Sequence, residues 1–305
     1  MNKKKVKLSV KVSVIIPTCR REWELKRALC SLAAQSFKNF EAVVINDNED
    51  DDWNIGVGTI IEEVRQMYPD MTIVHVNERK RMGSARARNL GIQSARGEFI
   101  TFLDDDDEYL PEKIERQLAF MEAEALDYSI TDLDLYYDDG HLSERRKRTY
   151  IQSTDSEQLF QYHLMHHMTG TDTLMFRKSF LERIHGFAPI DVGDEFYLIQ
   201  RAIEANGTFG YLPHCDVKAY VHKGEGGLSS GESKITGEMQ LYEHKKKYFH
   251  ILPTNCVRYI KMRHYCVLAF AYLRMKKYGK FLGLGLRAVL IDPVQSVGLL
   301  LGRRG

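Results

Sequence analysis

Short apolar runs and longer amphipathic stretches alternate along the first part of the chain. The apolar runs are rich in β-branched residues and predict buried strands at Val10–Ile16, Phe40–Ile45, Thr72–Val76 and Phe99–Leu103. Between them, apolar positions recur at a helical period and predict helices at Glu22–Ala34, Ile60–Tyr68, Ser84–Ala95 and onward from Pro111. Strands that alternate with helices indicate an α/β fold with a parallel sheet covered on both faces.

The second part of the chain follows a less regular pattern. Leu135–Ser143 predicts a hairpin turning at Asp139-Gly140. Helices are expected at Arg177–His185, closed by Gly186, and at Glu195–Ala205, closed by Asn206-Gly207. The Gly- and Ser-rich stretch 224–231 predicts a mobile loop, and the pattern is helical from there to the end, with a break at Asp292-Pro293. We therefore expect a catalytic domain at 1–230 and a helical region at 231–305.

Charge divides the chain at nearly the same place. Residues 241–305 hold 13 Lys and Arg but 2 Asp and Glu, a net +11; because the whole chain carries +1, residues 1–240 carry −10. Composition is otherwise ordinary for a globular protein, with 44% hydrophobic residues and no apolar run long enough to span a membrane. The five cysteines are odd in number and lack CxxC spacing, which favours free thiols in a reducing compartment, so a cytoplasmic location is expected.

The run Asp104–Asp107 directly follows the last predicted strand of the first part. Neighbouring carboxylates about 5 Å apart repel by roughly 3 kcal/mol per pair at an effective dielectric near 20. A divalent cation bridging a diphosphate would explain them, because Mg²⁺ and Mn²⁺ prefer oxygen ligands. The alternative is a solvated acidic turn that caps the helix at Pro111.

Other polar residues follow the earlier strands, where an open parallel sheet binds its ligands. They are Pro17-Thr18, Asn46-Asp47-Asn48 and Asn77. No GxGxxG follows the first strand and no GxxxxGK[ST] occurs, which excludes dinucleotide-binding and P-loop sites.

Two blocks resemble a known family: "SVIIPTCRR…SLAAQSFKNFEAVVINDNEDD" and "GSARARNLGIQSARGEFITFLDDDDEYLPEK". They resemble the inverting family 2 glycosyltransferases of the GT-A fold over residues 10–225, notably in A-R-N-x-G-I, G-E-F-I and F-L-D-x-D-D. The resemblance implies a nucleotide-diphospho-sugar donor, with UDP favoured, an acceptor hydroxyl on a glycan or lipid-linked molecule in cell-surface polysaccharide synthesis, and a metal, Mn²⁺ or Mg²⁺.

The resemblance also implies which residues form the site. Pro17, Thr18 and Asp47 would line the nucleotide, Asp104 and Asp105 would face the sugar nucleotide, and Asp106 would bind the metal directly. Arg88 would contact the donor, although a helix-surface arginine is an alternative. His222 would lie near the diphosphate as a second metal ligand, although a structural histidine is the more common role.

The catalytic base is expected on the helix that begins near Asp194. The family pattern [ED]-D-x-x-L-x-x-R resembles "GDEFYLIQRA", which places Glu195 at the base position and Asp194 before it. The helical period leaves Glu195 off the core face, in a first turn where the helix dipole favours an ionised carboxylate. Asp194 as a helix cap, with Glu195 only complementing the dipole, is the alternative.

Two other functions compete with sugar transfer. A sugar nucleotidyltransferase would carry a Gly-rich loop after the first strand, which "PTCRR" is not. A non-catalytic cation-binding module would explain the Asp run but not the A-R-N-x-G block.

The +11 tail has three possible roles: a helical region docked on the catalytic body, a surface that binds anionic membrane, and a nucleic-acid patch. Nucleic acid is disfavoured because nothing else resembles a binding fold for it. We expect docking and peripheral binding at the inner face of the membrane together, with one face packed inward and the basic face against lipid.

Overall fold

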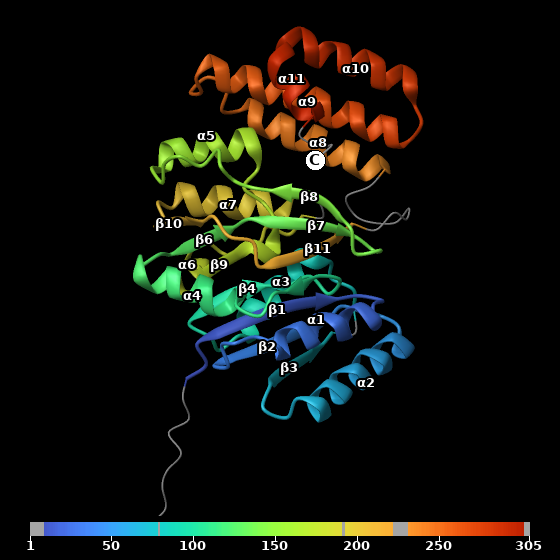
Figure 1. Cartoon of the computed structure of the whole chain (residues 1–305), viewed down its shortest axis with the longest axis vertical. Coiled ribbons are helices and arrows are strands. Elements are labelled where there is room, and N and C mark those ends of the chain that lie inside the picture. Colours follow the sequence, from blue (N-terminus) through green and yellow to red (C-terminus); the bar gives the residue numbers. More distant parts are fainter. Residues whose placement is uncertain (1–8, 79, 191–192, 222–230, 302–305) are drawn as a thin grey trace, which may run out of the picture.

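The computed structural model describes residues 9–78, 80–190, 193–221 and 231–301. Its main sheet has the strand order β10-β6-β9-β4-β1-β2-β3 (Figure 1). The bounds are β1 Val12–Thr18, β2 Phe40–Asn46, β3 Thr72–Asn77, β4 Phe99–Phe102, β6 Tyr128–Thr131, β9 Leu174–Arg177 and β10 Phe209–Leu212. The α/β fold and the first four strands are confirmed, and β4, β1, β2 and β3 run parallel to one another.

One strand overturns the expectation of an all-parallel sheet. β9 lies between β4 and β6 and is antiparallel to both. The 3₁₀ helix η1 (Thr171–Thr173) precedes β9 and lies at the carboxyl end of β4, where Asp172 accepts a hydrogen bond from the backbone N–H of Asp104. Because β9 starts where β4 ends, it must run back along β4.

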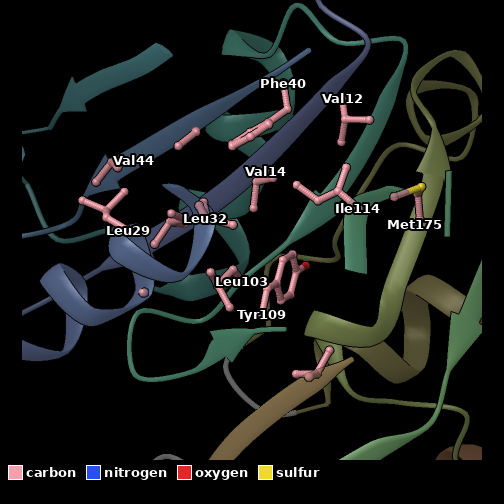
Figure 2. Packing of buried hydrophobic residues seen from close by; sticks show 14 of the residues in the cluster. Val12, Val14, Leu29, Leu32, Phe40, Val44, Leu103, Tyr109, Ile114 and Met175 are labelled. Carbon is pink, nitrogen blue, oxygen red and sulfur yellow. The ribbon is translucent and has the colours of Figure 1, made fainter. Parts of the chain in front are cut away.

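Helices cover both faces of this sheet, as predicted. Val14 of β1 points to a core formed with α1 (Trp23–Ala33), α2 (Asp51–Met67) and α4 (Lys113–Ala123), part of which Figure 2 shows. Ile15 points the other way, to a core formed with α3 (Ser84–Ser94), α6 (Lys178–Arg183) and α7 (Asp194–Glu204). This alternation is the period-2 pattern of a strand buried on both faces.

A smaller sheet packs beside the first, with the order β5-β11-β7-β8. Its strands are β5 Glu108–Tyr109, β7 Leu133–Tyr137, β8 Leu142–Arg146 and β11 Val217–Val221. β7 and β8 form the predicted hairpin, which turns at Gly140 with a φ of 83° that favours glycine. Asp107 lies between β4 and β5, so the acidic run connects the two sheets.

The C-terminal part is helical, with the bounds α8 Gly231–Lys246, α9 Thr254–Arg274, α10 Tyr278–Ile291 and α11 Pro293–Leu301. The predicted break at Asp292-Pro293 separates α10 from α11. α9 packs against α5 (Ser156–His166) and α7, where Ile260 meets Leu164 and Phe196. α10 and α11 lie at the end of the molecule opposite β3 and α2 (Figure 1). Among the described residues, no helix is both long and apolar enough to cross a bilayer.

Candidate active site

Three carboxylates converge at the carboxyl end of β4. Asp104, Asp107 and Asp172 each offer an oxygen, and these oxygens lie within 4.8 Å of one another. Asp172 Oδ1 accepts the backbone N–H of Asp104 at 2.6 Å, and Asp107 Oδ1 accepts the backbone N–H of Tyr220 at 2.9 Å. Backbone atoms of β11 and of the β4–β5 turn therefore hold the cluster in place.

Burial makes this cluster costly as three anions. Removal from water, together with the charge of Asp104, raises the pKa of the Asp172 carboxyl to about 8. Burial and the charge of Asp172 raise the pKa of Asp107 well above its usual value. Asp107 and Asp172 are thereby disposed to hold protons at neutral pH, and a hard divalent cation bound by these oxygens and that of Asp104 would replace those protons. The chemistry of the donor set fits the expected Mg²⁺ or Mn²⁺.

Asp105 and Asp106 point to a different partner, the Arg21 guanidinium. Arg21 Nη1 lies 2.8 Å from Asp105 Oδ1 and 2.5 Å from Asp106 Oδ2. Asp105 is buried, which raises the pKa of its carboxyl to about 7 even though the charge of Arg21 lowers it. The pair ties the loop after β1 to the acidic run, whereas the expected metal ligand Asp106 is directed to Arg21.

Arg88 links the acidic run to α7. Its Nη2 donates to Asp104 Oδ1 at 2.6 Å and its Nη1 to Asp194 Oδ2 at 3.1 Å. The side chain is buried, so the alternative of a helix-surface arginine is wrong. Two carboxylates raise the pKa of Arg88 despite its burial, so the guanidinium stays charged between them.

The two carboxylates of the predicted catalytic pair have different surroundings. α7 has Gly193 at its N-cap, so Asp194 is not the cap; its buried carboxylate pairs with Arg88, and burial raises its pKa to about 6. Glu195 is partly exposed. Its Oε2 accepts the N–H of Gly170 at 2.8 Å, and its Oε1 accepts the Thr171 hydroxyl at 2.6 Å. Only Glu195 combines a fixed carboxylate with access to solvent.

The loop that holds Glu195 is itself held by basic side chains from other elements. His167 ends α5 with a φ of 59°, and its Nε2 receives Lys245 Nζ at 2.5 Å and Arg263 Nη1 at 3.0 Å. Lys245 belongs to α8 and Arg263 to α9. The buried Arg148 guanidinium donates to the Thr169 carbonyl from the other side. The C-terminal helices thus reach the segment that leads to Gly170 and Thr171.

The predicted nucleotide residues lie together at the ends of β1 and β2. Thr18 ends β1, directly after Pro17, and its carbonyl accepts the N–H of Asp47 at 2.9 Å. The Asp47 carboxylate accepts the backbone N–H groups of Met82 and Gly83 at 2.6 and 2.9 Å, which positions the start of α3. Their contact with a nucleotide remains a prediction. His222 and nearly all of the predicted mobile loop lie outside the described residues.

Sequence reasoning missed several residues of the site. Asp172 lies far along the chain from Asp104, in a short 3₁₀ helix, and no spacing rule connects the two. Arg21 and Thr171 were missed for the same reason, because their partners are also distant in the sequence. The available signal was the position of Arg21 after the first strand, at the ligand-binding edge of the sheet.

A family model described as "Glycosyl transferase family 2" matches residues 13–183, more than half of the chain. This match contains all but the first residue of β1, the acidic run and the whole of β9, which runs antiparallel along β4. The chain belongs to glycosyl transferase family 2. The match ends before Asp194 and Glu195, so the base assignment of this family 2 glycosyltransferase rests on the motif and the geometry.

Curated relatives of this glycosyltransferase match part of the chain. An "Uncharacterized glycosyltransferase" of Rickettsia felis is 34% identical over 59% of this chain and 29% of its own length. A "GalNAc(5)-diNAcBac-PP-undecaprenol beta-1,3-glucosyltransferase" of Campylobacter jejuni is 32% identical over 56% of this chain and 53% of its own length. The chain thus spans about half or less of these relatives.

Solved structures confirm the GT-A fold over nearly the whole chain. S. aureus TarS 1-349 in complex with UDP-GlcNAc has a TM-score of 0.60 at 19% identity, covering 95% of this chain and 83% of that one. The mannosyltransferase PcManGT of Pyrobaculum calidifontis, in complex with GDP-Man and Mn2+, has a TM-score of 0.60 at 17% identity, covering 96% of this chain and 84% of that one.

Proposed function

We propose that this protein transfers a sugar from a nucleotide-diphosphate donor to an acceptor hydroxyl, with inversion at the anomeric carbon. The observation that carries the proposal is the Glu195 carboxylate, fixed by Gly170 and Thr171 at the start of α7 and connected to the acidic run through Asp194 and Arg88. Family membership and the GT-A fold support the same reaction class.

Glu195 would act as the general base. It takes the proton of the acceptor hydroxyl while that oxygen attacks the anomeric carbon and the bond to the nucleoside diphosphate breaks. The hydrogen bonds from Gly170 and Thr171 hold the carboxylate in one orientation. Asp194 is a weaker candidate because its carboxylate is buried against Arg88. A single displacement of this kind inverts the configuration.

A divalent cation, Mn²⁺ or Mg²⁺, would bind at the end of β4 and stabilise the charge that develops on the departing diphosphate. Two sets of ligands are candidates. The three converging carboxylates Asp104, Asp107 and Asp172 favour one set; the family motif favours Asp106, which would then have to leave Arg21.

The donor and the acceptor are proposed from chemistry and from relatives. Neighbouring structures hold UDP-GlcNAc and GDP-Man, and we favour a UDP-linked hexose or N-acetylhexosamine. A relative is named as acting on an undecaprenol-linked glycan, so we propose a glycan or lipid-linked acceptor in polysaccharide synthesis. Such an acceptor would place the protein at the cytoplasmic face of a membrane, where the +11 of residues 241–305 meets anionic lipid.

The test measures release of nucleoside diphosphate from a panel of nucleotide sugars with Mn²⁺, for wild type, Glu195→Gln and Asp194→Asn. We expect Glu195→Gln to lower turnover by at least ~10²–10⁴-fold with donor affinity nearly unchanged, because proton transfer contributes about that much.

Other outcomes would assign the site differently. Loss of turnover in Asp194→Asn with Glu195→Gln active would move the base by one residue. Exchange of pyrophosphate in place of diphosphate release would indicate a nucleotidyltransferase, and neither reaction would indicate a cation-binding module.

A further inference from the structure

An apolar stripe runs along the outer face of α10 and α11. Six large side chains form this α10–α11 stripe: Tyr278 60%, Leu282 66%, Leu286 61%, Leu290 76%, Val294 78% and Val297 49% exposed. In α10 they recur every fourth residue, which places them on one side of the helix. Gly279, Gly283 and Gly298 beside them have no atom within 4 Å of an added Cβ, so the surface around the stripe is open.

The stripe is not the face by which α10 holds to the protein. The opposite side of α10 packs on α9, where Ala288 is buried with Met262 and Cys266. Leu284 contacts the cluster of Leu268 and Ala271. α10 therefore has an apolar face for α9 and a second apolar face toward solvent, and the second face has no function in the fold of the described residues. Several large apolar side chains exposed along one side of a helix favour an interaction site there.

Positive charge surrounds the stripe. From His244 to Ile291 the sequence contains no Asp or Glu, and Lys276, Lys277, Lys280 and Arg287 are all exposed. Lys280 and Arg287 are seven residues apart, which places them on one margin of α10 beside the stripe. Lys277 pairs with Glu232 of α8, and Lys280 and Arg287 lie over the Tyr272 and Tyr265 rings of α9, yet all three side chains remain exposed.

We propose that the α10–α11 stripe is the surface by which this protein docks on an anionic lipid bilayer, lying in the plane of the headgroups with its six apolar side chains inserted. This inference deepens the membrane location proposed above and corrects its geometry, because apolar side chains and not a basic face would enter the lipid. Helices with an apolar face and Lys or Arg at its margin bind at the headgroup level.

Charge favours lipid over a second copy of the chain. Two copies meeting through this face would bring the same cations together, and like charges across an interface are unfavourable. Anionic headgroups offer the opposite sign, and each Lys or Arg close to such a surface adds to binding. α10 is 14 residues long and α11 is 9, so neither spans a bilayer, and docking in the plane of the interface is the geometry left to them.

The test is co-sedimentation of the full chain with phosphatidylcholine vesicles, with and without phosphatidylglycerol. We expect the wild type to bind the mixed vesicles and to be released by high salt. Leu282→Gln combined with Leu286→Gln should weaken binding at least tenfold even at low salt. Lys280→Gln combined with Arg287→Gln should remove most of the salt-dependent part and the preference for phosphatidylglycerol.

Matched controls keep the result specific. Ile55 of α2 is 67% exposed, like the leucines, but lies among acidic residues at the other end of the molecule, so Ile55→Gln should bind as the wild type does. Thermal unfolding should be unchanged in every variant, because the replaced side chains are exposed. The assay needs no donor, so a protein inactive in transfer can still bind vesicles.

Two outcomes would overturn the proposal. One is vesicle binding that the paired leucine substitution leaves intact. The other is a wild type that ignores vesicles but is dimeric by light scattering and becomes monomeric on Leu282→Gln with Leu286→Gln, which would assign the stripe to self-association.

Discussion

Buried ionisable side chains gather in two regions of the molecule, with opposite chemistry. At the end of β4 they are carboxyls, and burial raises the pKa of Asp105 to about 7 and that of Asp172 to about 8. Where α5 meets α7, α8 and α9 they are histidines. Burial lowers the pKa of His163 to about 3, that of His166 to about 4 and that of His167 well below its usual value.

Burial shifts both sets of groups toward their uncharged forms, but with different consequences. At the strand end, oxygens of Asp104, Asp107 and Asp172 converge within 4.8 Å, so a cation can take the place of the protons on Asp107 and Asp172. The histidines already have protein partners. His163 stacks on Phe196, and its two ring nitrogens contact the Phe196 carbonyl and the Met168 N–H. Converging oxygens therefore mark a candidate ligand site, whereas ring nitrogens that already have partners mark a contact between helices.

The largest effect is expected from Arg88→Met, which removes a buried cation from the acidic region. Asp104 and Asp194 would lose their partner, and breaking a buried ion pair from one side costs about 3–5 kcal/mol. Urea unfolding should show this loss. Lys246→Met, which breaks an exposed pair with Glu243, should cost less than about 1 kcal/mol. Equal, small losses in both variants would contradict the role of Arg88.

A divalent cation should stabilise the acidic region next most strongly. The folded carboxyls of Asp107 and Asp172 have raised pKa values, so the folded state binds protons more tightly than the unfolded state. Without metal, the free energy of unfolding should then fall as pH rises from about 4 toward 8. Mn²⁺ at 100 times its Kd should add about 2.7 kcal/mol. At one fixed Mn²⁺ concentration the gain should be larger at pH 8 than at pH 6, because fewer protons must leave and the Kd is lower.

Two variants decide which residues bind the cation. Loss of the Mn²⁺ increment in Asp172→Asn would support the cluster of Asp104, Asp107 and Asp172, whereas loss in Asp106→Asn alone would support the family motif. An increment that no substitution at this strand end reduces, or no increment at any pH, would remove the metal from the proposal.

The smallest of the three effects on the free energy of unfolding is expected from acid, which should destabilise the histidine region. His163 is neutral when folded and has an ordinary pKa of about 6.5 when unfolded, so the folded state loses stability as pH falls below that value. At pH 5 the cost is about 2 kcal/mol for this one residue, from about 1.36 kcal/mol per pH unit. Because the raised carboxyl pKa values change the total in the opposite direction, the cost is read as the difference between wild type and variant in urea unfolding at pH 7 and pH 5, and His163→Gln should remove this contribution. His141→Gln, at an exposed hairpin histidine, should not.

Much of the sheet was predictable because its strands are apolar on both faces and its helices are periodic. Only the second half of α2 was predicted, at Ile60–Tyr68. The helix begins at Asp51, where the Asp50 side chain caps it. Trp53, Asn54 and two glycines interrupt the helical period of apolar residues in its first half. The direction of β9 depends on where η1 lies in space, which no local pattern records.

The candidate site divides in the same way. Asp104–Asp107, Asp194 and Glu195 were found because each follows a predicted strand or opens a predicted helix. Asp172 and Arg21 were not found, because their partners are distant in sequence and only folding brings them together. The Arg88 bridge between Asp104 and Asp194 likewise needs α3, β4 and α7 to be in place.

The contact of Lys245 and Arg263 with His167 has a consequence for how such enzymes can be recombined. These two side chains come from α8 and α9, and the loop they hold supplies the groups that orient Glu195. In a chimera that joins this sheet to the helical end of a relative, the loop would lose its contacts with Lys245 and Arg263. The helical end is therefore not interchangeable, and a functional chimera should need Lys245, Arg263 and His167 to come from the same parent.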